Sequence, residues 1–145
     1  MAAPWHLWPV GLVTLVLHGL AALDFTMAWR QNPAYHAALP APLRENLAAS
    51  LAAMPLWALI AWAIGVWAAL AGSALLLMLS RHAVACFATA IIGSAGHGAH
   101  ALFLAQPALP AELVAGTRLS VALSLVLLLA VMAYASRLFQ QGVLR

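Results

Sequence analysis

The sequence predicts an all-α integral membrane protein: a bundle of four antiparallel transmembrane helices in a single domain, residues 1–145. Two observations on composition support this prediction. Hydrophobic residues make up 66% of the chain and charged residues 6%, and the mean hydropathy is +1.01. Because soluble domains carry about 25% charged residues, three acidic residues and six arginines cannot cover a soluble surface. The lipid bilayer is therefore the expected environment.

Four apolar runs are the third observation, and they cover residues 8–29, 56–80, 83–104 and 119–136. Each contains about 18–25 residues, which crosses a hydrocarbon core of about 30 Å at about 1.5 Å per residue. Backbone groups in lipid must be satisfied within the segment, so each run is expected to be a helix. The first run follows no basic stretch and precedes no small-residue cleavage site. We interpret it as a permanent span and not as a signal peptide.

The loops bear on the orientation. Only Arg81 and His82 separate the second run from the third, so these two helices are predicted to form an antiparallel hairpin. The arginines divide equally between the two sides of the membrane. The short basic hairpin and the basic C-terminal tail favour cytoplasmic termini. We expect a multi-pass protein of the bacterial inner membrane with both termini in the cytoplasm.

The first loop is the longest, and part of it has helical periodicity. Pro42 suits a first helical turn, and apolar residues follow at helical spacing as Leu43, Leu47, Leu51 and Met54. Two interpretations remain open for residues 42–54. They form either an interfacial helix on the outer surface or an extension of the second span that is kinked at Pro55.

Three ionisable side chains inside the predicted spans form the main candidate site. Asp24 is the only carboxylate in any of these spans, and the third carries His97 and His100 in "GSAGHGAHALF". If the first and third spans cross in parallel, Asp24 and His97 lie at the same depth, about 21–23 Å from the cytoplasmic boundary. A lone carboxylate at that depth either pairs or is protonated. We therefore predict an intramembrane polar cluster of Asp24, His97 and His100.

Several roles are open for this cluster. It can fix the bundle by interhelical hydrogen bonds, or it can lie on a pathway for protons or solutes. Two histidines and a carboxylate also form an allowed metal-ligand set, but one HxxH motif is a weak signal. Haem ligation would need His18, whose estimated depth differs from that of His97 by about 8 Å or more. We predict no metal and no cofactor.

His18 is the second polar site in the spans. It shares a stripe of the first helix with Gly11, Thr14 and Phe25, about 120° from Asp24. We expect a neutral imidazole that is hydrogen-bonded to a serine or threonine of another helix. The two candidates for this partner are Ser73 and Ser124.

Small residues mark a further set of positions. Gly65 and Gly72 lie on one face of the second span, and Ala90 and Gly93 lie on one stripe of the third. Small residues let helix backbones approach closely, so these faces suit helix packing or dimerisation.

Composition also limits the function. The arginines are scattered and lysine is absent, which argues against nucleic acid as a partner. No constellation typical of catalysis occurs, so we expect no enzyme. The leading hypothesis is an accessory or interaction protein that packs through its small-residue faces, as a homo-oligomer or a subunit of a larger membrane complex. The alternative is an oligomeric small-solute or proton-coupled transporter with Asp24, His97 and His100 on the pathway.

Three longer stretches stand out together: "HGLAALDFTMAWRQNPAY", "MPLWALIAWAIGVWAALAGSALLLMLSRHAV" and the C-terminal "GVLR". They resemble a family of small, mostly uncharacterised bacterial four-span inner-membrane proteins, some of which carry an automatic sugar-transporter label. The resemblance implies a four-span fold in the inner membrane and transfers no catalytic or binding residue to this chain. The PQ-loop motif of SWEET-like sugar transporters is absent. No Asn or Gln falls within a predicted span, which argues against a roomy sugar-binding cavity.

Overall fold

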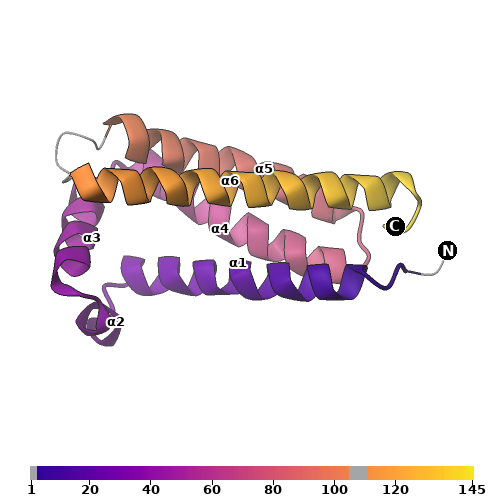
Figure 1. Cartoon of the computed structure of the whole chain (residues 1–145), viewed down its shortest axis with the longest axis horizontal. Coiled ribbons are helices and arrows are strands. Elements are labelled where there is room, and N and C mark those ends of the chain that lie inside the picture. The colour runs from indigo at the N-terminus through magenta and orange to yellow at the C-terminus, as the bar shows by residue number, and fades with distance from the viewer. Residues whose placement is uncertain (1–2, 105–110) are drawn as a thin grey trace.

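The computed structural model describes residues 3–104 and 111–145, and these residues are helical almost throughout (Figure 1). The elements in order are α1 (Leu7–Trp29), α2 (Pro33–Ala38), α3 (Ala41–Ala53), α4 (Leu56–Leu77), α5 (His82–Ala99), a π-helical turn η1 (His100–Leu104) and α6 (Ala111–Gln140). The described residues contain no strand. The predicted all-α class is therefore confirmed.

Four helical segments are long and apolar enough to cross a membrane: Leu7–Trp29, Leu56–Leu77, His82–Leu104 and Ala115–Gln140. The chain is thus a multi-pass membrane protein. The fourth helix extends beyond the predicted run of 119–136, as far as Gln140. It ends where Gly142 adopts a φ of 71°, and the Val143 N–H donates to the Leu138 carbonyl at 2.9 Å. This is the geometry of a glycine-terminated helix end.

The spans follow one another in space as they do in sequence. α1 packs on α4, α4 packs on α5, and α5 packs on α6, whereas α1 and α6 have little direct contact in the described part of the chain. In Figure 1, α1 and α6 lie in front of α4 and α5, with both termini at one end. Consecutive spans therefore make the main contacts, and His6, just before α1, is hydrogen-bonded to Tyr134 of α6 at 2.6 Å.

The closest packing lies between α4 and α5. A Cβ atom added to Gly93 would lie 2.5 Å from the Gly65 nitrogen, and one added to Gly72 would lie 2.9 Å from the Phe87 ring. Ala90 is fully buried in the same core. The small-residue faces of the two helices thus contact each other within one chain. Gly65, Gly72, Ala90 and Gly93 thus pack two helices of the same chain. Association with a second molecule through these faces stays a prediction.

The loop after α1 folds into two short helices at the end of the bundle opposite the termini (Figure 1). The Asn32 side chain caps α2 by accepting hydrogen bonds from the Ala34 and Tyr35 backbone N–H groups at 3.0 and 3.1 Å. Met54 and Pro55 have extended backbone, with ψ of 122° and 150°. α3 is therefore a separate helix, and the interpretation as a kinked extension of α4 is wrong.

Candidate functional site

His18 and Ser73 form a polar pair in the middle of the bundle. His18 lies halfway along α1, and its Nδ1 atom is 2.7 Å from the Ser73 Oγ atom on α4. The exposed fractions are 7% for His18 and 0% for Ser73. Ser73 is one of the two expected partners. Because the serine hydroxyl donates its single hydrogen to the Ala69 carbonyl at 3.0 Å, the arrangement assigns Nδ1–H of His18 as the donor to Ser73.

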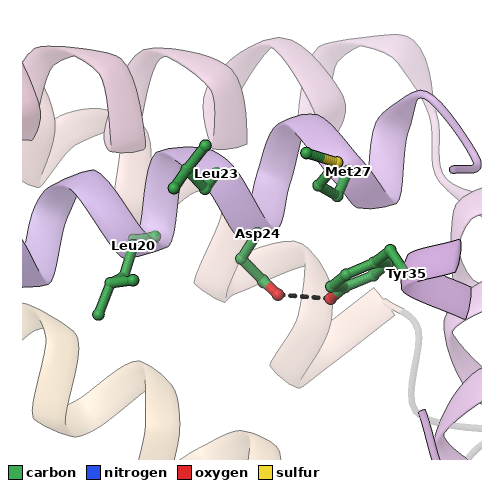
Figure 2. A pocket seen from close by; sticks show the side chains of 6 residues that line it. Leu20, Leu23, Asp24, Met27 and Tyr35 are labelled. Carbon is green, nitrogen blue, oxygen red and sulfur yellow. Dashed lines mark hydrogen bonds between the residues drawn. The ribbon is translucent and has the colours of Figure 1, made fainter. Parts of the chain in front are cut away.

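Asp24 lies on a different side of α1 from His18. Its carboxylate is exposed and accepts a hydrogen bond from the Tyr35 hydroxyl on α2. Figure 2 shows this pair beside Leu20, Leu23 and Met27. In the described part of the chain, Asp24 has no hydrogen bond to a histidine. The predicted cluster with His97 and His100 is therefore wrong.

The neighbour of Asp24 explains the error. Successive residues of a helix point about 100° apart, so Asp24 and Phe25 cannot both face the bundle centre. Phe25 is buried and its ring meets that of Trp62 edge-on, with the centroids 4.9 Å apart. The apolar ring gains more from burial than the carboxylate, whose desolvation is costly.

Asp24 also has a favourable position where it stands. It precedes the last residue of α1, Trp29, by five residues, or about 7–8 Å. The Asn32–Pro33 helix start turns α2 back towards α1, and Tyr35 then reaches the carboxylate. An acidic side chain near a helix end thus obtains a hydrogen-bond donor from outside the span.

The hydroxyl group of Tyr35 retains the proton that it donates to Asp24. Burial, followed by the hydrogen bond to Asp24 and the charge of that carboxylate, raises the pKa of Tyr35 to about 12. The phenol therefore keeps its proton at neutral pH and can donate it to the carboxylate.

His97 and His100 lie one turn apart and contact tryptophans of α4. The His97 ring stacks on Trp62 with centroids 4.9 Å apart and planes at 16°, and the His100 ring meets Trp57 edge-on at 5.5 Å. Trp62 therefore contacts both His97 and Phe25 and stands where the carboxylate was expected. Within the described residues, the Nδ1 atoms of both histidines are buried without a hydrogen-bond partner.

These positions leave the metal and haem alternatives without geometric support. Within residues 3–104 and 111–145, no group of three His, Cys, Asp or Glu side chains is placed to hold an ion. His18 is hydrogen-bonded to Ser73, whereas the rings of His97 and His100 contact those of Trp62 and Trp57, respectively. The polar groups of the spans are thus dispersed over separate local contacts.

Two residues that sequence reasoning missed have central places here. Tyr35 lies outside the predicted spans, although the Asn32–Pro33 pair before it is a recognisable helix start. Trp62 lies within the second predicted span, where no sequence motif singles it out. Its contact with His97 depends on the rotation of α4 against α5, for which the sequence has no local signal.

Comparison with known proteins finds no matching family model, curated protein or solved structure. The fold and its hydropathy define the class, a four-span membrane protein.

Proposed function

We propose that this protein is a non-enzymatic accessory subunit of the bacterial inner membrane, with both termini in the cytoplasm. It binds another membrane protein, or further copies of itself, through the outer half of α6. This surface replaces the small-residue faces of α4 and α5, which contact each other within the chain.

The burial along α6 is the observation that carries this proposal. One stripe of the helix is buried in the half near the C-terminus, at Leu128, Val131, Ala135 and Leu138. The same stripe continues at helical spacing to Ser124 and Ser120, which are both exposed. The stripe is therefore exposed at Ser124 and Ser120, whereas the neighbouring Val121 is partly buried over Gly98 of α5.

The chemistry of the exposed half supports a protein partner. Serine hydroxyls within spans commonly form hydrogen bonds between helices. Here the Ser124 hydroxyl donates to the Ser120 carbonyl of its own helix at 2.8 Å, which leaves the oxygen lone pairs for an outside donor. Only 17% of the α6 membrane window is buried, against 28% in each of the other three spans. α6 thus presents the largest share of unpacked surface.

Site-specific photocrosslinking in cells tests the proposal. A benzophenone amino acid replaces Leu123, which lies between the two serines and is 61% exposed. The matched control position is Ile92 on α5, which is 74% exposed. We expect a discrete crosslinked product of fixed stoichiometry from position 123 and none from position 92. The double substitution S120L and S124L should abolish the product without changing the helical content.

Two outcomes would contradict the proposal. The first is an equal crosslinking pattern at both positions, and the second is a product that persists in the double variant. Transport remains the alternative, although it no longer has a joint site of Asp24, His97 and His100. Proteoliposomes with an internal pH-sensitive dye test that alternative directly. A proton flux that D24N or H97A abolishes would favour transport over the accessory role.

A further inference from the structure

The charged residues of the chain are distributed unequally between the two ends of the bundle (Figure 1). The end opposite the termini carries three arginines and all three acids, which are Arg30, Arg44 and Arg118 and Asp24, Glu45 and Glu112. The end that holds the termini carries the three remaining arginines, Arg81, Arg137 and Arg145. The formal charges therefore cancel at the first end and leave +3, the net charge of the whole chain, at the second.

The C-terminal tail brings two of the remaining arginines together. The Arg145 N–H donates to the Leu79 carbonyl at 2.8 Å, and the Arg81 N–H donates to the Arg145 carbonyl at 2.9 Å. The preceding tail residues, Val143 and Leu144, are buried, with exposed fractions of 8% and 3%. The backbones of Arg81 and Arg145 are thus held side by side, and both side chains are exposed.

Arg137 belongs to the same hydrogen-bonded unit. Its carbonyl accepts from the Gln141 N–H at 3.0 Å, and the tail turns at Gly142 immediately afterwards. The Arg137 side chain is exposed as well. Helix dipoles add little to the charge here, because α1 and α5 begin at this end whereas α4 and α6 finish there. The three guanidinium groups therefore determine the electrostatic potential of this surface, which we call the basic end.

The membrane side of the basic end is apolar. Ala133, Ala130 and Val126 follow Arg137 at helical spacing towards the middle of α6, and all three are exposed. An acyl chain on this stripe lies within the span, and the phosphate of the same lipid then lies at the level of Arg137. The surface thus presents its charged and apolar parts in the order of a phospholipid.

We propose that the basic end binds an anionic phospholipid such as phosphatidylglycerol. Guanidinium groups bind phosphate through charge-assisted hydrogen bonds, and arginines next to a membrane surface attract anionic lipids. Phosphatidylcholine carries a cation beside its phosphate, which the arginines repel. A terminal carboxylate on Arg145 would offset one of the three charges and leave the surface positive.

A lipid suits this surface better than a free phosphate, which shares the same chemistry. The arginines lie where the spans end, and the exposed apolar stripe of α6 continues directly from Arg137. The accessory surface at Ser120 and Ser124 lies about 20 Å or more along the helix from Arg137. Failure of either proposal therefore leaves the other intact.

Native mass spectrometry of the full chain in detergent tests this inference. The protein is incubated with equal amounts of phosphatidylglycerol and phosphatidylcholine that have identical acyl chains. We expect the phosphatidylglycerol adduct to exceed the other by more than about fivefold, because each arginine at a membrane surface contributes about that factor. R81Q, R137Q and R145Q should each lower this ratio by about twofold to fivefold. The triple variant should bring it close to one.

R118Q is the matched control, because it removes an exposed arginine of α6 at the opposite end. It should leave the ratio unchanged. The clamp of the tail uses backbone groups, so the glutamine variants should fold, and circular dichroism checks their helical content. Equal adducts in the wild-type protein, or a loss in R118Q as large as that in R137Q, would overturn the proposal.

Two further measurements separate the lipid from other anions. Inorganic phosphate at the concentration of the lipid should not displace the phosphatidylglycerol adduct, and displacement would assign the site to a free anion. A benzophenone amino acid at Phe139, which is 49% exposed, should give no protein product that depends on the three arginines. A protein crosslink that the triple variant abolishes would overturn the proposal, by assigning the basic end to an acidic segment of another protein.

Discussion

His18 and Asp24 lie six residues apart on α1, and each forms one polar pair. The two pairs face opposite environments. His18 points into the bundle and donates to Ser73 on α4, whereas Asp24 points outward and accepts from Tyr35 on α2. The histidine donates one hydrogen bond inside the bundle, whereas its Nε2 atom is buried without a partner among the described residues. The acid lies near the helix end, where a loop residue can reach it without burial of the charge. Polarity alone therefore does not determine which residue faces the core.

Substitutions in the inner pair, His18 and Ser73, should lower the free energy of unfolding more than substitutions in the outer pair, Asp24 and Tyr35. Ser73→Leu adds volume at a fully buried position and leaves the His18 Nδ1 without an acceptor. We expect a loss of about 2–5 kcal/mol in the free energy of unfolding. Titration of helicity with SDS in mixed micelles measures it. Ser73→Ala, which removes only the hydroxyl, should lose less, and an unchanged stability in the leucine variant would contradict the packing described here.

A double-mutant cycle with His18→Leu and Ser73→Ala isolates the hydrogen bond from the packing. The two side chains are in direct contact at 2.7 Å, so their effects should not be additive. We expect a coupling energy of about 0.6–1.7 kcal/mol, the range found for hydrogen bonds between membrane helices. Strict additivity of the two substitutions in SDS titration would show that the pair contributes no specific interaction.

The same cycle on the outer pair, with Asp24→Asn and Tyr35→Phe, should give a smaller value. Both side chains are partly accessible, and solvent screening weakens the interaction. We expect each single change to alter the free energy of unfolding by less than about 1 kcal/mol, with a coupling near 0.5 kcal/mol or below. A coupling larger than that of His18 and Ser73 would reverse the comparison.

High pH should affect the outer pair through Tyr35, whose pKa is raised from 10.0 to about 12. The folded protein holds the phenolic proton more tightly than the unfolded chain. The resulting stabilisation is complete below pH 10 and is lost as the pH rises through about 12. Ultraviolet absorbance of tyrosinate follows this titration. In Asp24→Asn the midpoint should fall, yet stay above 10.0, because burial is the largest cause of the shift.

The variant Tyr35→Phe should remove that titration phase and leave the signal of the other tyrosine, Tyr134. An identical titration curve in wild type and Asp24→Asn would show that the carboxylate does not influence the phenol.

The sequence predicted the elements of the fold better than the contacts between them. The buried stripe of Gly11, Thr14, His18 and Phe25 follows from helical periodicity. The expected partner Ser73 could be named because few hydroxyls occur at a suitable depth. For Asp24, a match in depth with His97 was a poor guide, because depth leaves the rotation of each helix undetermined.

Hydropathy and periodicity by themselves determined that the chain crosses the membrane four times as helices, because lipid requires each span to satisfy its own backbone. Only the tertiary structure decided the neighbours of each side chain. The rotation that packs Gly93 on Gly65 also stacks His97 on Trp62. The fold of the loop after α1 brings Tyr35 to Asp24. Both results depend on non-local packing of whole surfaces, for which a linear pattern has no signal.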